Sequence, residues 1–291
     1  MNYSGMPEGG PLVIPGPFHF EAANITLFFC RTQAAKNLQL FMPPGVSLWN
    51  PLFPKGMIIV ALADYPKVWA EAMPTDFYTY KEICLFIPCL HLKSGPALFC
   101  PFIYLNDATA MCVGREIYGF PKKAARLDID EGGRGGAASL TSSGAEIITL
   151  KWENEEEREL PDIVENIINL MPGIDFFKNQ IKKAVGLVEE QLPQAMLFLK
   201  APILNWKRIY GVNSTLKKPV WAVNEVTSVR LQVSRIKQLR LLEVTREAVQ
   251  FHGSPHDPLE KFTPLKTFTA TRAVMDFTLP PGKVLSQLSK R

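Results

Sequence analysis

Short apolar runs, separated by proline and glycine, are the feature that most constrains how this chain can fold. Across the first 150 residues these runs are rich in β-branched and aromatic residues, which favours strands over helices. Several are apolar at consecutive positions, as in strands that are covered on both faces. The same texture returns after about residue 201. The runs that we expect to be strands are ITLFFC, MIIVALA, ICLFIPCLHL, ALFCPFIYL, AARLDID and EIITLKW in the first part, and KRIYGVN, VWAVNEVTSVRLQV, RLLEVTREAVQF and TFTATRAVMDFTL in the second.

Between the two strand-rich parts, residues 161–200 space their apolar side chains three and four apart, which predicts helices. We find no internal repeat. The sequence therefore predicts a single α+β domain over residues 1–291, dominated by antiparallel sheet, with a helical insert at about 161–200. The insert could cover a pocket as a lid, pack on the sheet or make a subunit contact, and the sequence leaves these roles open.

The composition argues against several classes of protein. The 291 residues are 47% apolar and 21% charged, and charges of both signs spread along the chain to a net +4, which favours neither a nucleic-acid partner nor a membrane surface. We see no signal peptide and no apolar run near the roughly 18–20 residues of a spanning helix. The five cysteines contain no C-x-x-C pair, so we expect reduced, mostly buried thiols in a cytoplasmic protein.

The stretch GREIYGFPKKAARLDID, residues 114–130, holds the strongest candidate for chemistry. A lysine amine can condense with a ketone to form an electron-withdrawing iminium. A nucleophilic lysine needs a pKa several units below about 10.4, which burial and a nearby cation both favour. Pro121 favours extended backbone before it, and neighbours on a strand point to opposite faces. We therefore expect Lys122 and Lys123 not to share one pocket.

Alternation along this stretch does not settle which lysine points inward. Upstream, Lys122 shares parity with the aromatic residues Tyr118 and Phe120. Downstream, Lys122 falls on the charged face of RLDID, whereas Lys123 falls on its apolar face. A bulge or bend near the pair would reconcile the two patterns. On these residues alone, a solvent-exposed lysine pair is the more ordinary interpretation.

GREIYGFPKK resembles the signature of the acetoacetate decarboxylase family, in which Gly-Arg-Glu and a short spacer precede an aromatic residue, Pro, Lys and Lys. Weaker similarity covers most of the chain. GPFHF and FFCRT resemble the family's N-terminal strand, YKEICLFIP its Tyr-x-Glu strand, and AVQFHGSPHDPLEKFTPLK and AVMDFTLPPGKV its closing strands. The resemblance implies a closed, cone-like antiparallel β-barrel with the pocket inside and helices outside.

The resemblance also implies roles for particular residues. Lys122 matches the family's Schiff-base lysine and Lys123 its cationic neighbour; the family is a standard example of a lysine activated in this way. Glu82 matches the acid of the Tyr-x-Glu strand, which orients the substrate or moves protons. The motif further implies substrate contacts, although its adjacent opposite charges could equally be structural: Arg115, Glu116, Tyr118 and Phe120.

Two positions depart from the family pattern. Ala22 and Ala23 stand where the decarboxylase has an arginine that handles the substrate carboxylate, and Ile58 or Ile59 stands where it has a second glutamate. No substitute is visible in the sequence, although Arg31 or Arg115 could be recruited. These changes predict a larger, more apolar pocket and a bulkier, more hydrophobic substrate.

The resemblance implies three candidate functions. The first is decarboxylation of a β-keto acid through an iminium and an enamine, a carbon–carbon lyase reaction that needs no metal or organic cofactor. The second keeps the Schiff base but performs an aldol, dehydration or cyclisation step on a keto metabolite of specialised metabolism. The third is a barrel that binds an apolar small molecule without catalysis. For each we expect a small-molecule partner and no nucleic acid or membrane, and the family's habit suggests a homo-oligomer.

Overall fold

The computed structural model describes residues 16–48, 55–132, 135–156, 201–210, 214 and 220–288. The helical insert predicted at about 161–200 lies outside these residues, and so does any role for it as a lid. Both stay predictions.

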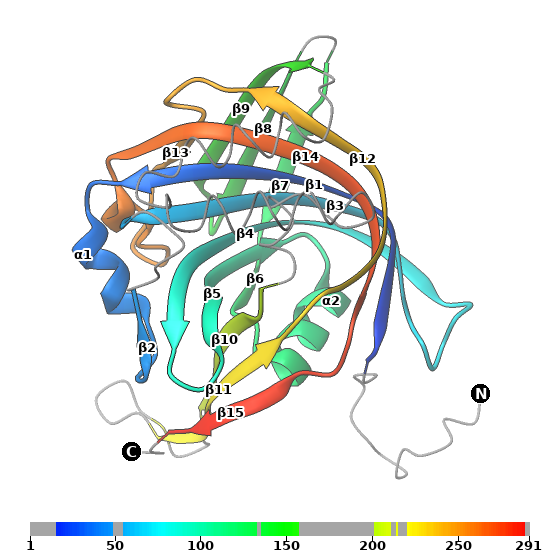
Figure 1. Cartoon of the computed structure of the whole chain (residues 1–291), viewed down its shortest axis with the longest axis vertical. Helices are drawn as coiled ribbons and strands as arrows, with labels where there is room; N and C mark the ends of the chain where they lie inside the picture. The colour runs from blue at the N-terminus through cyan, green and yellow to red at the C-terminus, as the bar shows by residue number, and fades with distance from the viewer. Residues whose placement is uncertain are drawn as a thin grey trace, which may run out of the picture.

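Strands account for most of the described structure (Figure 1). Their order along the chain follows the apolar runs of the sequence, which confirms the prediction of a β-dominated fold. They are β1 (Phe18–Thr32), β2 (Val46–Ser47), β3 (Met57–Ala70), β4 (Phe77–His91), β5 (Gly95–Leu105), β6 (Lys122–Ala124), β7 (Arg126–Asp130), β8 (Gly135–Ser142), β9 (Ala145–Glu156), β10 (Ile203–Tyr210), β11 (Trp221–Val229), β12 (Gln232–Glu243), β13 (Val249–Phe251), β14 (Leu265–Leu279) and β15 (Lys283–Gln287).

Helical structure is brief in the described part of the chain. It consists of α1 (Ala35–Leu38), α2 (Ala108–Val113), a π-helical turn at Gly114–Tyr118, and 3-10 turns at Gln39–Phe41 and Leu259–Phe262. The start of α2 has a clear sequence cause, because the Asp107 carboxylate accepts a hydrogen bond from the Ala110 amide at 2.7 Å and so caps an otherwise unpaired donor.

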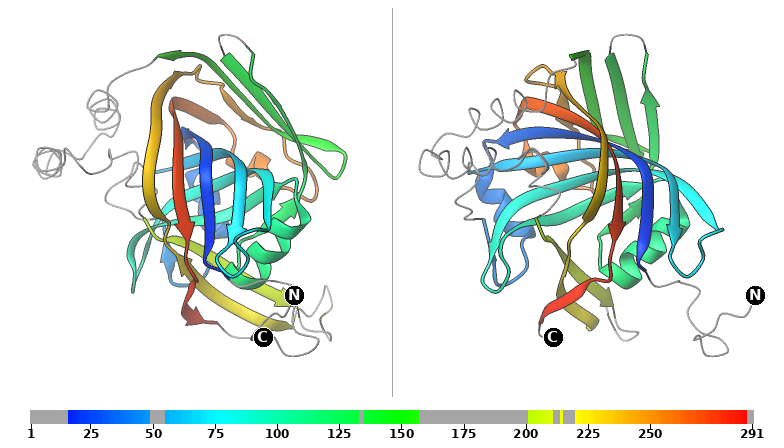
Figure 2. Two further views of the ribbon diagram at one scale, coloured as in Figure 1. Left: turned by 90° about the vertical axis from the view of Figure 1, so that its right-hand side faces the viewer. Right: turned by 45° about the vertical axis from the view of Figure 1, so that its right-hand side comes forward.

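The described strands join into one 15-stranded sheet, along the path β15-β11-β10-β5-β4-β3-β1-β14-β12-β9-β8-β7. All neighbours are antiparallel except where β5 pairs with β6 and with β10. The long strands β1, β3, β12 and β14 lie side by side along a curved part of the sheet, and β7, β8 and β9 form a layer beyond them (Figure 2).

The hydrogen-bonded path of the described strands is not itself a closed ring, which differs from the closed barrel that we expected. The circuit is instead completed by the chain. Strand β6 pairs with β5, β7 pairs with β8, and β6 leads directly into β7 through Ala125. The Ala125 amide donates to the Leu105 carbonyl at 2.9 Å, which holds this junction against β5. A cone therefore forms although one seam lacks a regular strand pair.

Two apolar clusters lie on opposite faces of the sheet. In β3, Ile59, Ala61 and Ala63 belong to the cluster inside the cone, whereas Ile58, Val60 and Leu62 belong to the cluster on the other face. Because successive side chains point to opposite faces, a strand that is covered on both sides needs apolar residues at every position. This confirms the prediction made from MIIVALA. Each large side chain so buried contributes about 1.5–3 kcal/mol to folding.

Candidate active site

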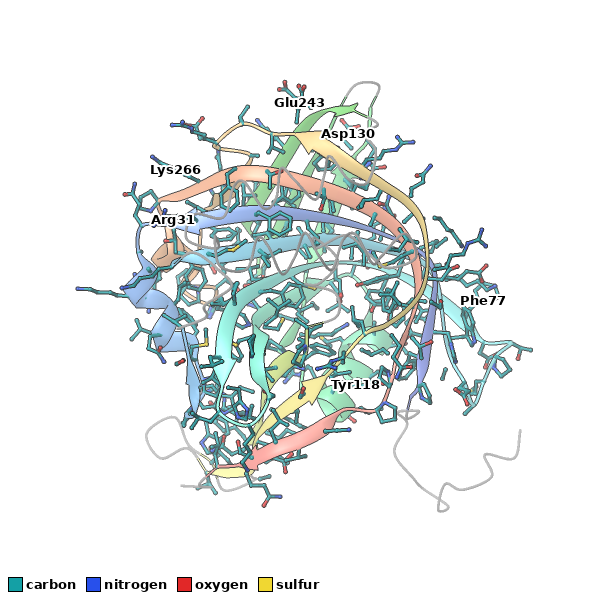
Figure 3. The ribbon with its side chains drawn as sticks, in the orientation of Figure 1. Arg31, Phe77, Tyr118, Asp130, Glu243 and Lys266 are labelled. Atoms are coloured by element: carbon teal, nitrogen blue, oxygen red, sulfur yellow. The ribbon has the colours of Figure 1, made fainter. Side chains whose placement is uncertain are left out.

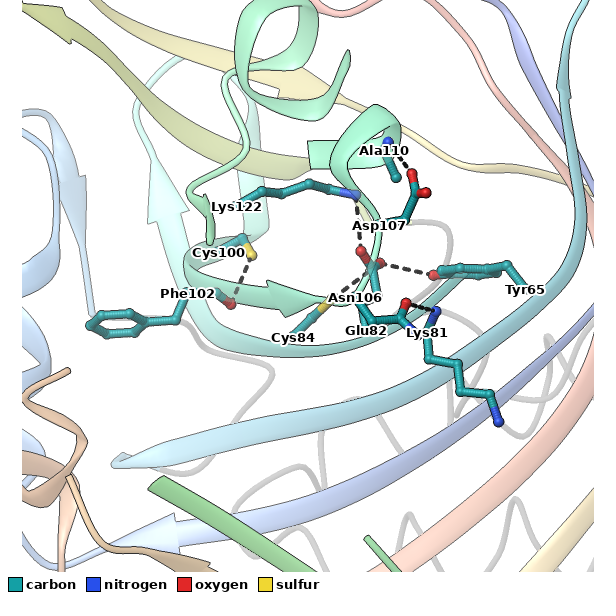
Figure 4. Close-up of polar contacts among 10 residues, drawn as sticks. All are labelled: Tyr65, Lys81, Glu82, Cys84, Cys100, Phe102, Asn106, Asp107, Ala110 and Lys122. Carbon is teal, nitrogen blue, oxygen red and sulfur yellow. Dashed lines mark hydrogen bonds and ion pairs between the residues drawn. The ribbon is translucent and has the colours of Figure 1, made fainter. Parts of the chain in front are cut away.

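Lys122 and Glu82 reach the inside of the cone from β6 and β4, the strands on the two sides of β5 (Figure 4). Cys84 of β4 stands opposite Ile103 of β5, and Ile103 stands opposite Lys122 of β6. Residues that stand opposite each other in a sheet point to the same face, so this row directs the lysine side chain inward. Glu82 shares the inward face with Cys84, two positions along β4.

The two side chains form a buried ion pair. Lys122 Nζ lies 2.9 Å from Glu82 Oε2, and the side chains are only 6% and 8% exposed. The ammonium group also lies 4.9 Å from the centre of the Tyr80 ring and 5.9 Å from that of Phe120. A charge held among aromatic rings is costly unless it is paired, and here Glu82 supplies the pairing.

The second oxygen of Glu82 accepts two further hydrogen bonds. The Tyr65 hydroxyl donates to Oε1 at 3.1 Å, and the Cys84 thiol donates to the same atom at 3.3 Å. Burial, and then the charge of Glu82, raise the pKa of Tyr65 and of Cys84 well above the ordinary values, so both groups keep the protons that they donate. Glu82 is thereby oriented by three donors.

Steric constraints explain why positions 114 and 119 of the motif are glycines. A Cβ added at Gly114 would lie 2.5 Å from Cδ and 2.6 Å from Cε of Lys122, so the lysine stem packs directly on the Gly114 backbone. Gly119 has a φ of +74°, and a Cβ there would lie 2.5 Å from Cβ of Lys207. Only glycine meets both conditions without strain.

Lys123 points away from the cavity, to the opposite face of the sheet. Its Nζ lies 2.8 Å from both carboxylate oxygens of Asp257, whose side chain is 2% exposed. Tyr104 and Ser254 donate to the same carboxylate at 3.0 and 3.1 Å. Burial acts to raise the pKa of Asp257, but these hydrogen bonds outweigh it and hold the pKa below the ordinary value. The two lysines therefore do not share a pocket, as the strand geometry predicted.

The upstream and downstream side-chain patterns around Lys122 disagree for a reason other than the bulge or bend that we expected. Residues 114–118 form a helical turn rather than an extended segment, so the upstream parity argument rested on the wrong local structure. Beyond the pair, the alternation continues: Lys123, Leu127 and Ile129 are half-buried on one side, and residues 126, 128 and 130 are exposed on the other. The inward face is covered at Lys122 and open to solvent beyond it.

The structure separates the motif residues that were expected to contact substrate. Phe120 lines the cavity beside Lys122. Arg115 and Glu116 are exposed and lie outside the lining. Tyr118 is buried but also outside the lining, where its hydroxyl donates to the Leu279 carbonyl at 3.2 Å and its own carbonyl accepts from Thr227 at 2.8 Å. Its role in the described structure is to anchor the π-helical turn.

The cavity and the open space at its mouth together hold about 790 Å³, and the cavity wall is apolar apart from one end. At that end lie the two ionic residues of the lining, Glu82 and Lys122, with Tyr65, Tyr80 and Cys84 around them. Aliphatic and aromatic side chains form the remaining wall, among them Ile25, Leu27, Ile59, Phe86, Leu98 and Leu231.

The two positions that depart from the family pattern lie differently relative to the cavity. Ile59 lines the cavity, whereas Ile58 packs in the cluster on the opposite face. Ala22 and Ala23 lie outside the lining, at an irregularity in β1 where the Ala22 amide donates to Asp276 at 2.7 Å. Arg31, a possible substitute cation, is exposed near one end of β1, and Tyr118 lies near the opposite end of that strand (Figure 3).

Tyr65, Cys84 and Asp257 were not among the residues that we expected at the site. Cys84 carries a signal in the sequence, because it has the same strand parity as Glu82. Tyr65 and Asp257 carry none that separates them from other tyrosines and aspartates. In the described ranges there is no cluster of three His, Cys, Asp or Glu side chains that could hold a metal, and no helix there is long and apolar enough to span a membrane.

Comparison with curated proteins and solved structures finds relatives of one kind. An acetoacetate decarboxylase from Ralstonia nicotianae is 29% identical over 120 residues, which are 41% of this chain and 43% of that protein, so the match spans less than half of the relative. The acetoacetate decarboxylase of Legionella pneumophila has a similar fold, with a TM-score of 0.70 at 19% identity over 98% of this chain and 94% of that one.

Two further structures share the fold at 14% identity. An acetoacetate decarboxylase-like enzyme from Sphingomonas wittichii RW1 has a TM-score of 0.66 over 94% of this chain and 95% of that one. The enduracididine biosynthesis enzyme MppR, complexed with pyruvate, has a TM-score of 0.64 over 97% and 95%. Residues 10–185, more than half of the chain, match the family description "Acetoacetate decarboxylase (ADC)", and the chain therefore belongs to the acetoacetate decarboxylase family.

Proposed function

We propose that this protein is an enzyme that forms a Schiff base between Lys122 and the carbonyl carbon of a keto substrate with an apolar substituent. The observation that carries the proposal is the buried Lys122–Glu82 pair at the polar end of an otherwise apolar cavity. A lysine directed into such a cavity costs free energy that a purely structural role does not require.

The contacts of the pair suggest how the amine becomes reactive. Glu82 Oε2 takes a proton from Lys122 Nζ across 2.9 Å, which leaves a neutral amine. The amine adds to the substrate carbonyl carbon, and the carbonyl oxygen leaves as water after gaining one proton from the amine nitrogen and one from the protonated Glu82, which becomes a carboxylate again. The resulting iminium is positively charged, and the Glu82 carboxylate stabilises that charge. Tyr65 and Cys84 act as positioning residues that hold the carboxylate in place.

Two fates of the iminium follow from the chemistry. In decarboxylation, a β-carboxylate leaves as carbon dioxide and its bonding electrons form an enamine, which is protonated on carbon and hydrolysed. Membership in the family supports this lyase reaction. In the second fate, Glu82 removes an α-proton and the enamine carbon attacks another carbonyl, as in aldol, dehydration or cyclisation steps of specialised metabolism.

A specific observation favours the second fate. Among the described lining residues, the ionic groups are Glu82 and Lys122 alone, so the cavity offers no arginine to a substrate carboxylate. One structure of MppR, which has a similar fold, is complexed with the condensation product of pyruvate and imidazole 4-carboxaldehyde, and this lends support to the second fate.

Borohydride reduction followed by intact-mass measurement tests the Schiff base directly. Hydride adds to the iminium carbon and converts it into a stable secondary amine. We expect a ketone adduct on wild type and on Lys123→Ala, and none on Lys122→Ala. Lys123→Ala is the matched control because it removes the neighbouring amine, which faces Asp257 instead of the cavity. Adduct that persists in Lys122→Ala refutes the proposal, and tight ligand binding without any adduct indicates a non-catalytic binding protein.

We further propose that the protein is a cytoplasmic homo-oligomer that acts on a small molecule. All five cysteines are free, and all but Cys112 are buried, which supports a reducing compartment. The oligomeric state rests on the family resemblance, and sedimentation of the purified protein measures it.

A further inference from the structure

Among the described residues, the charges that line the cavity sum to zero. Glu82 and Lys122 neutralise each other at 2.9 Å, and the other described lining residues are apolar side chains, two tyrosines and a cysteine. A bound carboxylate would therefore add an uncompensated negative charge to a largely apolar space. An uncompensated charge in such surroundings is strongly disfavoured.

Four cations of the described residues are candidates to compensate a carboxylate, and all four lie outside the cavity lining. Lys123 faces the other side of the sheet and is held by Asp257. Arg115 and Arg31 are exposed and outside the lining. Arg272, which is mostly buried, donates to Thr26 at 3.0 Å and lies 3.3 Å from the Glu131 carboxylate, outside the cavity.

Hydrogen-bond donors in the lining are also largely engaged. Tyr65 and Cys84 direct their protons to Glu82. The Tyr80 hydroxyl remains as a donor to a substrate oxygen, and one phenol suits a neutral carbonyl or hydroxyl better than a full negative charge. Forming the iminium does not change the net charge of the described cavity lining, because the positive charge of the iminium replaces that of the lysine and still faces Glu82.

From these observations we infer that the substrate is an uncharged carbonyl compound with an apolar chain or ring, not a keto acid. The inference rests on the proposed Schiff base at Lys122. The bond that breaks after iminium formation is then a carbon–hydrogen bond: Glu82 Oε2 takes the α-proton, and the bonding electrons form the carbon–carbon double bond of the enamine. Carbon dioxide is not a product.

Two pairs of ketones, each an acid and its methyl ester, test the inference by borohydride trapping. The short pair is 3-oxobutanoate and methyl 3-oxobutanoate, which places the charge beside the carbonyl. The long pair is 7-oxooctanoate and its methyl ester, which places the charge among the apolar walls. In both pairs we expect half-maximal trapping at a concentration at least about tenfold lower for the ester, since burial and like-charge repulsion disfavour the acid. The ester is the larger molecule, so size alone predicts the opposite order.

The Glu82→Gln variant separates electrostatics from shape. Removing the carboxylate leaves Lys122 without its counter-charge, so we expect the preference for the ester to fall several-fold in the short pair, where the charges would be close. An unchanged ratio in this variant, or equal or better trapping of the acids by wild type, overturns the inference while leaving Lys122 chemistry intact. Accelerated release of carbon dioxide from 3-oxobutanoate overturns it as well. Absence of any adduct with all four compounds, or adduct retained in Lys122→Ala, instead refutes the proposed function.

Discussion

The packing of Lys122 on Gly114 predicts that one added methyl group disables the site. In Gly114→Ala, the new Cβ would lie 2.5 Å from Cδ and 2.6 Å from Cε of the lysine. Two carbon atoms rest at about 3.5–4.0 Å, so the lysine stem has to move by about 1 Å. The amine at the end of this stem is held beside the Tyr80 and Phe120 rings and is paired with Glu82, so a shift of the stem moves Nζ away from the carboxylate. A displacement of this size costs on the order of a hundredfold in rate.

The assay is the initial rate of borohydride trapping at a fixed, subsaturating ketone concentration, combined with urea unfolding of each variant. We expect Gly114→Ala to trap about a hundredfold more slowly, and to lose about 1–3 kcal/mol of stability from overpacking. Gly144→Ala is the matched control: it makes the same chemical change at a φ of +82°, where no atom lies within 4 Å of the new Cβ. It should lose stability from backbone strain yet trap like wild type. A folded Gly114→Ala protein that traps at the wild-type rate would refute the packing argument.

Three further predictions concern the groups around the site. Asp257→Asn should lower the unfolding free energy at pH 7 by about 1–3 kcal/mol, because it weakens a buried charged network. The pKa of Asp257 in the folded protein lies below its ordinary value, so the stability that the carboxylate contributes is present above the ordinary pKa and is lost as the pH falls through the folded-state pKa. The unfolding free energies of the two proteins, measured with urea, should therefore converge in acid. A difference that persists unchanged at low pH contradicts this. Tyr65→Phe should slow trapping by about tenfold with little loss of secondary structure, as expected when an oriented hydrogen bond to Glu82 is removed, and wild-type rates would show that the phenol does not position the carboxylate. A maleimide should label one thiol of the native protein, Cys112, because the other cysteines are buried; mass spectrometry that finds rapid labelling of Cys84 would mean that the cavity opens freely to solvent.

The family of the chain could be recognised from its sequence because the chemistry is concentrated in a short motif. GREIYGFPKK carries the proposed nucleophile, Lys122, and the glycine on which it packs within ten residues, and the alternation of side chains along a strand is enough to place the two lysines on opposite faces. The apolar runs identified the strands for a similar reason, since residues covered on both faces of a sheet must be apolar at nearly every position.

Where local rules compete, the sequence was a poorer guide. The stretch before the lysines has β-branched and aromatic residues, and we expected it to be extended. It forms a π-helical turn because Tyr118 is anchored by Leu279 and Thr227, whose positions are more than 100 residues away along the chain. The closed barrel of the resemblance is likewise completed through Ala125 and not by a strand pair, a detail of register that no motif encodes.

The sequence by itself determined the family, the strand-rich fold and the position of the lysine pair, because each depends on residue types at short, fixed spacings. Only the tertiary structure decided which groups surround that lysine. Glu82 pairs with it across 40 positions, Tyr65 reaches the same carboxylate from β3, and Asp257 holds Lys123 from a distant loop. These partners meet because the curvature and register of the sheet bring separate strands together, and a pattern read along one strand carries no information about what lies across the cavity.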